Sequence, residues 1–180
     1  MNKKDFSLKT IGPNDIRIIY DWRNSDRVRF NMFESEIIPF ENHLKWCEGL
    51  KNNTRSKCVM FQWKGENIGV ITAKELDSNI NKWIWGCYLG DGNYFQGAGT
   101  LMGLFALEYC FEKLNIDLLI GEAVAKNETS LRFNARIGFK TEATFLKTTS
   151  LGRQIPAILL TLRKGEWDNI KDGLFLKYLN

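Results

Sequence analysis

The sequence predicts an α/β fold built on one mixed, mostly antiparallel sheet of six to seven strands flanked by helices. Three observations support this prediction. Segments with strand periodicity alternate with segments of helical periodicity, a buried strand leads through a glycine-rich turn into an apolar helix, and another strand follows that helix. A strand, a helix and a strand in this order form a parallel crossover, which we expect at the centre of the sheet.

The size and composition are those of one globular domain. The chain has 180 residues, of which 44% are hydrophobic and 26% charged, and no repeat or low-complexity linker divides it. We therefore expect a single domain over 1–180, with its core at about 6–163 and a short helical tail at 164–180.

Simple counts exclude several classes of protein. The apolar runs fall short of the roughly 20 residues that span a bilayer, and a polar stretch follows the basic N-terminus, so we expect a cytoplasmic protein with no membrane partner. The 4 cysteines form no C-x-x-C pair and there is 1 histidine, so we expect no metal. The net charge of +4 is dispersed along the chain, and we expect no nucleic-acid partner.

Helices are predicted first. Pro13 opens a periodic apolar stretch, which predicts a helix to about Arg23, because a missing N–H costs nothing at a helix start. A second helix follows Pro39, and its border carries His43. Its buried stripe consists of Phe40, Leu44, Cys47 and Leu50.

Strands follow in the middle of the chain. Residues 58–64 and 68–76 predict two strands joined by a hairpin turn at Gly65-Glu66-Asn67. Residues 83–89 are apolar on both faces, which is typical of a central strand covered on both sides.

The second half alternates helix and strand. Residues 100–114 are apolar almost all round and predict a buried helix. The remaining predicted elements are a strand at 117–125, a helix at 127–137, strands at 139–148 and 154–163 joined at Leu151-Gly152, and the short C-terminal helix.

The glycine-rich turn has the composition of a phosphate site. Free N–H groups and the helix dipole meet where a strand passes into a helix. Phe95 and Met102 interrupt a Rossmann pattern, and Ala98-Gly99 stands where a Walker loop needs lysine and a hydroxyl residue. The alternative interpretation is a mere tight turn. The glycines are Gly90, Gly92, Gly97, Gly99 and Gly103.

Two motifs resemble the GCN5-related N-acetyltransferases (GNATs). Gln96-Gly97-Ala98-Gly99-Thr100-Leu101 is similar to the family's Q/R-x-x-G-x-G/A pyrophosphate loop, with Leu101 as a departure from glycine or alanine. Asn127-Glu128-Thr129-Ser130, followed by Gly138-Phe139, is similar to its second acetyl-coenzyme A (acetyl-CoA) segment. The resemblance covers about 6–163 and implies the GNAT fold. Acetyl-CoA would then be the co-substrate, with the strand before the loop pairing with its pantetheine arm and the amides of 97–101 binding its pyrophosphate. The implied cofactor-binding residues are Leu89, Gln96, Gly97, Ala98, Gly99, Thr100, Leu101, Asn127 and Ser130.

The N-terminal half resembles a narrower group. Trp22-Arg23-Asn24, then Met32, then His43-Leu44-Lys45-Trp46, is similar to the pattern of the PseH-type acetyltransferases. These acetylate the 4-amine of a UDP-linked 4-amino-4,6-dideoxy sugar in pseudaminic acid biosynthesis. The implied substrate-binding residues are Arg23, Asn24, Met32, His43 and Lys74. Each has a simpler alternative role: His43 packs at a helix border, Arg23 caps its helix, and Lys74 is solvated.

Candidate catalytic groups follow from the chemistry of acetyl transfer. Glu122 shares a strand face with Leu118, Ile120 and Val124, so desolvation should raise its pKa towards that of a useful general base, unless it forms a buried salt bridge or a cap. Many family members supply a tyrosine as the acid, but position 134 is Asn134, which we expect to hydrogen-bond the sulfur. Tyr88 is a stand-in acid or a core tyrosine. The resemblance implies that a backbone N–H near Leu89 meets the oxyanion.

We therefore expect an N-acetyltransferase that moves the acetyl group to the 4-amine of a UDP-amino sugar by direct attack in a ternary complex. The sequence offers few candidate general bases, which favours an acceptor amine of low pKa over a lysine side chain. One alternative is a protein N-terminal acetyltransferase of the RimJ/RimL-like branch, and another is a non-catalytic acyl-CoA-binding module. The assembly state stays open, with a homodimer as one candidate.

Overall fold

The computed structural model describes residues 1–90, 92 and 94–179. Within this part of the chain, one sheet contains seven strands in the order β1-β2-β3-β4-β5-β7-β6, which confirms the predicted α/β class and sheet. The strands are β1 (Phe6–Thr10), β2 (Ser56–Trp63), β3 (Glu66–Asp77), β4 (Lys82–Leu89), β5 (Leu118–Val124), β6 (Lys140–Thr148) and β7 (Gln154–Arg163). The helices are α1 (Asp15–Asn24), α2 (Asp26–Arg29), α3 (Phe40–Leu50), α4 (Ala98–Glu108), α5 (Glu128–Arg136) and α6 (Lys164–Leu179), with helical turns at Lys3–Asp5 and Tyr109–Lys113.

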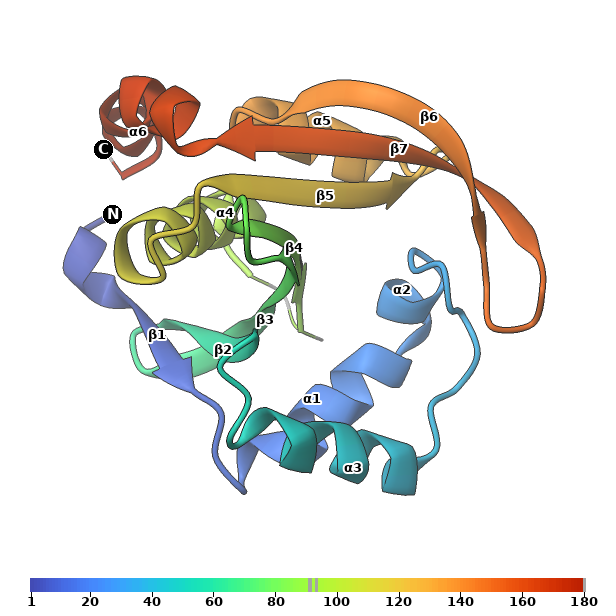
Figure 1. The fold of residues 1–180 in the computed structure, drawn as a ribbon. Coiled ribbons are helices and arrows are strands. Elements are labelled where there is room, and N and C mark those ends of the chain that lie inside the picture. Colours follow the sequence, from blue (N-terminus) through green and yellow to red (C-terminus); the bar gives the residue numbers. More distant parts are fainter. Residues whose placement is uncertain (91, 93, 180) are drawn as a thin grey trace.

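The β4–β5 junction divides the sheet. These two strands are parallel, whereas all other neighbouring strands in the described sheet are antiparallel. They pair only between residues 82–84 and 118–120 and then separate. Figure 1 shows β1 to β4 and β5 to β7 diverging from this junction. The rest of β4 and β5 therefore has an unpaired edge.

The main core lies between the sheet and α4. This helix is the predicted crossover and is apolar all round because the sheet covers one side and α6 covers another. Phe61, Ile71 and Leu119 of the sheet belong to this core, as does Trp167 of α6, which is completely buried.

A second, smaller core lies on the opposite face of the sheet. Ile19 of α1 packs there on Cys58 and Met60 of β2 and on Val70 of β3. This packing fixes α1 over the half of the sheet formed by β1 to β4, and α3 contacts both α1 and β2. The N-terminal helices are therefore held next to the divided junction (Figure 1).

Two elements differ from the sequence predictions. No strand was expected before residue 58, yet Phe6–Thr10 forms β1 and pairs with β2. Its pattern is weak because, of its 5 residues, only Phe6 is buried. The tail is not short: α6 has 16 residues, and its Trp167 stacks on Phe111 with ring centroids 6.1 Å apart. Among the described helices, none is long and apolar enough to cross a membrane.

Candidate active site

A large cavity occupies the gap between the two halves of the sheet. Its volume is about 1050 Å³, and its walls come from α1, the segment around α2, α3, β3 to β5, the start of α4, and α5. Most of the residues predicted for the site line it. The groups that converge there are described below, element by element.

Main-chain groups line both open edges of the cavity. The Gly90 N–H donates to the Ile68 oxygen at 2.9 Å, and hydrogen-bonded residues alternate along an antiparallel pair. The N–H and C=O of Leu89 therefore point away from β3 and into the cavity. By the same argument, the bond of 2.9 Å from Ala125 N–H to the Pro156 oxygen turns the main chain of Glu122 towards the cavity. The Leu89 oxygen already accepts a hydrogen bond of 3.0 Å from Arg27 Nη2, so the Leu89 N–H is the group that β4 offers to an extended ligand there.

The start of α4 forms a cradle for an anion. Gly97 caps the helix with a φ of +94°, a conformation that favours glycine, and a Cβ added there would meet nothing within 4 Å. Ala98 N–H donates to the Phe95 oxygen and Leu101 N–H to the Gly97 oxygen, so two of the five predicted donors are already used. Within the described residues, the N–H groups of Gly97, Gly99 and Thr100 have no hydrogen-bond partner. Positions 91 and 93 of the turn lie outside the described residues.

The other residues of the predicted loop have separate roles. The Leu101 side chain is 1% exposed and belongs to the main core, so it does not obstruct the cradle. Thr100 accepts a hydrogen bond of 3.3 Å from Arg136 Nη1, which joins the start of α4 to the end of α5. Ala98 is buried and Gln96 is exposed. These positions fit the pyrophosphate of a coenzyme A molecule, because free N–H groups, the helix dipole and a nearby guanidinium converge there.

The predicted second acetyl-CoA segment caps α5. Asn127 Oδ1 accepts from the Ser130 N–H at 3.0 Å, so this asparagine fixes the start of the helix. One turn later, Asn134 Nδ2 donates to Ser130 O at 2.9 Å and to Ser130 Oγ at 3.3 Å. An amide nitrogen has two donors, and both are used here. Asn134 therefore has no free donor for a thiolate, contrary to the prediction.

Glu122 has a partner that the sequence pattern did not reveal. Its carboxylate forms a close ion pair with Lys147 Nζ of β6 and is 20% exposed. The expectation of an unpaired carboxylate in an apolar row is wrong, and the salt-bridge alternative describes the structure. Lys147 also lies 4.7 Å from the ring centroid of Phe33.

Tyr88 is poorly suited to donate a proton. Burial raises the pKa of Tyr88, although the nearby Arg23 guanidinium opposes this shift. Its ring packs on the smaller core, next to Val70. The alternative interpretation as a core tyrosine fits these contacts better than the role of stand-in acid.

Two predicted substrate residues have different environments. Arg23 lines the cavity, donates from Nη2 to the Glu34 oxygen at 2.9 Å, and has a buried Nη1 with no partner among the described residues. Asn24 uses both ends of its amide on the Ile38 main chain, at 2.9 Å and 3.0 Å, and is absent from the cavity lining. Asn24 therefore fastens the segment after α2 and does not face a substrate here.

The other three predicted substrate residues line the cavity. His43 is 4% exposed, and its Nε2 donates to the Ile16 oxygen at 3.0 Å. Burial lowers the pKa of His43, so a neutral ring is favoured. These contacts match the packing alternative, although the ring edge reaches the cavity. Met32 and Lys74 also line it, and Lys74 is exposed.

Several residues of this site were not found from the sequence. Arg27 and Trp85 line the cavity, and Lys147 pairs with Glu122. Arg132 and Arg136, one helical turn apart on α5, also line it. Of these residues, only Arg132 and Arg136 could have been recognised from the local sequence. They follow the asparagine motif at positions i and i+4, which share one face of a helix.

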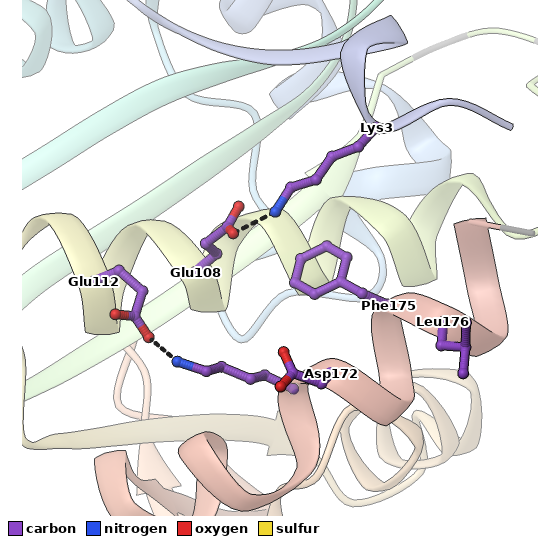
Figure 2. A pocket seen from close by; sticks show the side chains of 7 residues that line it. Lys3, Glu108, Glu112, Asp172, Phe175 and Leu176 are labelled. Carbon is purple, nitrogen blue, oxygen red and sulfur yellow. Dashed lines mark hydrogen bonds and ion pairs between the residues drawn. The ribbon is translucent and has the colours of Figure 1, made fainter.

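A second cavity of about 540 Å³ lies on another side of the molecule, between the N-terminal turn, the end of α4 and α6. Figure 2 shows two ion pairs at this cavity: Lys3 pairs with Glu108, and Lys171 with Glu112. Asp172 also lines it, so both cations of this lining are paired and carboxylates are in excess, whereas cations are in excess in the lining of the large cavity.

Comparison with known proteins shows the family of the chain and the solved structures of similar fold. The family model described as an acetyltransferase (GNAT) domain matches residues 6–140. No curated protein matches the chain at a significant level. A solved structure of spermidine N-acetyltransferase from Vibrio cholerae in complex with CoA and spermine is 15% identical with a TM-score of 0.83, over 93% of this chain and 100% of that one. A putative acetyltransferase from T. thermophilus is 16% identical with a TM-score of 0.77, over 98% and 95%. A dodecameric form of the Vibrio cholerae spermidine enzyme has a TM-score of 0.73 at 15% identity, over 93% and 98%.

Proposed function

The chain belongs to the acetyltransferase (GNAT) domain family and is an acetyl-CoA-dependent N-acetyltransferase, and on that premise we propose that its acceptor is a nucleotide-linked amino sugar. The reacting group would be the 4-amine of a UDP-linked amino-dideoxy sugar, as in pseudaminic acid biosynthesis. The observation that carries this proposal is the charge of the large cavity.

Positive charge dominates the cavity wall. Among the described residues that line it, Glu122 is the one carboxylate, and it pairs with Lys147. The cationic lining residues are Arg23, Arg27, Lys57, Lys74, Arg132 and Arg136. Such a wall attracts phosphates and repels a polycation. A diphosphate-bearing acceptor therefore fits better than a polyamine, which the spermidine enzymes of similar fold take as their substrate by name.

The acceptor side offers specific contacts for such a molecule. Arg23 presents a buried Nη1 without a partner among the described residues, and an unsatisfied guanidinium donor suits a phosphate oxygen. Trp46 is 41% exposed and lies 5.4 Å from the His43 ring, so its free face is available to stack on a uracil base. Lys74 lies on β3 at the cavity wall.

The residues of the chain divide the work of transfer. Acetyl-CoA supplies the thioester. The N–H groups of Gly97, Gly99 and Thr100 would hold the pyrophosphate, and the Leu89 N–H would donate to the acetyl oxygen as it gains charge. Glu122 would take the proton from the amine, directly or through water.

This set of catalytic groups suits an acceptor amine that is easily deprotonated. An amine with a pKa of about 7.8 is neutral roughly a quarter of the time near pH 7.4, whereas a lysine amine is neutral about once in a thousand. A sugar amine flanked by oxygens resembles the former. A thiol has a pKa of about 8.5, so its thiolate leaves without a strong acid, which is consistent with the raised pKa of Tyr88 and the occupied donors of Asn134.

The proposal is tested by thiol release from acetyl-CoA over a panel of amines. The panel contains UDP-linked 4-amino-4,6-dideoxy sugars, the same sugars without the nucleotide, spermidine and short peptides with free N-termini. We expect the highest kcat/KM with a UDP-sugar and a loss of at least tenfold without the nucleotide. A higher kcat/KM with spermidine or a peptide would reject the acceptor class, and CoA binding without release over the whole panel would favour a binding module.

A further inference from the structure

Arg27 is a cation of the large cavity that lies on the short helix α2. Its Nη2 donates to the Leu89 oxygen at 3.0 Å and, more closely, to the Gly90 oxygen. Both oxygens belong to the end of β4, just before the turn that leads to the phosphate cradle. The charged guanidinium of Arg27 thus donates hydrogen bonds to main-chain oxygens, and hydrogen bonds from a charged donor are stronger than those between neutral groups.

The same end of β4 is held on a second side. The Trp22 indole of α1 lies directly against Gly90, and a Cβ added at Gly90 would overlap its ring. On the third side, Gly90 N–H donates to the Ile68 oxygen of β3. Ser25 connects the two helical contacts, because its Oγ donates to the Trp22 oxygen at 2.8 Å at the start of α2. Trp22, Arg27 and β3 together fix the peptide units at 89 and 90.

This fixation adjoins the peptide unit that carries the Leu89 N–H. The register of β4 with β3 directs that N–H into the cavity, and the last bond of this pairing runs from the Gly90 N–H to the Ile68 oxygen. Bonds from Arg27 to the oxygens of Leu89 and Gly90 restrict rotation of the chain there. A donor that stabilises developing charge works only when its direction is fixed in advance.

We propose that Arg27 is a positioning residue for acetyl transfer, which keeps the Leu89 N–H aimed into the cavity by fixing the end of β4. The inference rests on the proposed function, in that it assigns the Leu89 N–H to the acetyl oxygen. It gives the α2 segment a role in the chemical step in addition to any role in binding the acceptor.

The test compares Arg27→Ala and Arg27→Lys with the wild-type enzyme. With whichever panel amine the wild type acetylates, Arg27→Ala should lower kcat about tenfold or more, less than the 10²- to 10³-fold loss of a whole oxyanion donor. The Kd for CoA should change less than about threefold. Arg27→Lys should recover part of kcat, because an ammonium still donates to one of the two oxygens.

A second measurement does not need turnover. Hydrogen exchange of the Gly90 amide, followed by NMR in the CoA complex, should become about tenfold faster in Arg27→Ala. Arg17→Ala is the matched control, because Arg17 is exposed on α1 and pairs with Asp21, and both readouts should stay at the wild-type level.

The outcomes separate the two proposals. A wild-type enzyme that acetylates no panel amine defeats the proposed function, and the exchange measurement still decides the role of Arg27. Unchanged Gly90 exchange in Arg27→Ala, or a raised KM for acetyl-CoA with an unchanged kcat, overturns the positioning role. A thermal unfolding curve accompanies each variant, and Arg27→Lys replaces Arg27→Ala if the latter does not fold.

Discussion

At the scale of single residues, the acid–base chemistry that we propose for the cavity depends on Glu122, which pairs with Lys147. The carboxylate comes from β5 and the ammonium from β6, and they meet at the wall where the two halves of the sheet separate. The remaining exposure of Glu122 leaves room for an amine or a bridging water.

Replacing Glu122 by glutamine tests this role. Glu122→Gln keeps the size of the side chain but cannot accept the proton, so kcat should fall about 10²-fold or more while KM for acetyl-CoA stays within about threefold. Steady-state thiol release measures both. Glu75→Gln is the control, since Glu75 also lies on a strand and pairs with Arg55, but outside the cavity lining. Turnover that survives Glu122→Gln would remove Glu122 as the base.

A site residue could be predicted from the sequence where its role depends on residues next to it in the chain, and not where it depends on a distant partner. Gly97 and Asn127 could be found because a helix start requires a particular local chemistry, and the structure has both as helix caps. The Glu122–Lys147 pair could not, because its members are 25 positions apart in the sequence, with helix α5 between them. Asn24 shares the α1 motif with Arg23, but only the folded chain shows that its amide is used on Ile38.

At the scale of elements, the end of β4 lies between the Leu89 N–H, which we propose as the catalytic donor, and the start of α4, which we propose as the phosphate site. Three elements hold it, namely β3, α1 and α2. Gly90 is necessary there because the Trp22 ring occupies the position that a side chain would take. The glycine-rich turn therefore serves close packing at its start and ligand approach at Gly97.

Gly90→Ala and Gly49→Ala should have opposite effects on stability. A methyl group at Gly90 must displace the Trp22 ring, which should lower the free energy of unfolding by about 1–3 kcal/mol. At Gly49, within the sequence of α3, a methyl group meets nothing within 4 Å and should raise it by about 0.5–1 kcal/mol. Urea unfolding measures both. Equal stability of Gly90→Ala and the wild type would argue against the close contact.

The elements that the sequence predicted well are those with a full apolar pattern. α4 could be predicted because nearly all of its residues are buried, and β4 because both of its faces carry apolar side chains, of which Trp83 and Trp85 are buried. β1 has 5 residues with one buried side chain, so its pairing with β2 and not its own pattern makes it a strand. Trp167 of α6 stacks on Phe111, a contact between residues far apart in the sequence that only the folded chain shows.

At the scale of the whole molecule, the division of one sheet creates the cavity in which we propose that acetyl transfer takes place. β4 and β5 stay paired for three residues and then part, so that two rows of main-chain groups, one helix start and a positive wall surround the same space. The sequence indicated the crossover and its glycine-rich turn. It could not indicate how far the strands separate, because that depends on where the pairing of β4 with β5 ends.

The central claim is that this space holds acetyl-CoA with its pyrophosphate at the start of α4. A crystal structure of the protein with CoA tests it most directly. We predict pyrophosphate oxygens within hydrogen-bond distance of the N–H groups of Gly97, Gly99 and Thr100, with the pantetheine arm along the open edge of β4. A CoA molecule bound outside the gap between β4 and β5, or one whose phosphates make no contact with residues 97–100, would contradict the account.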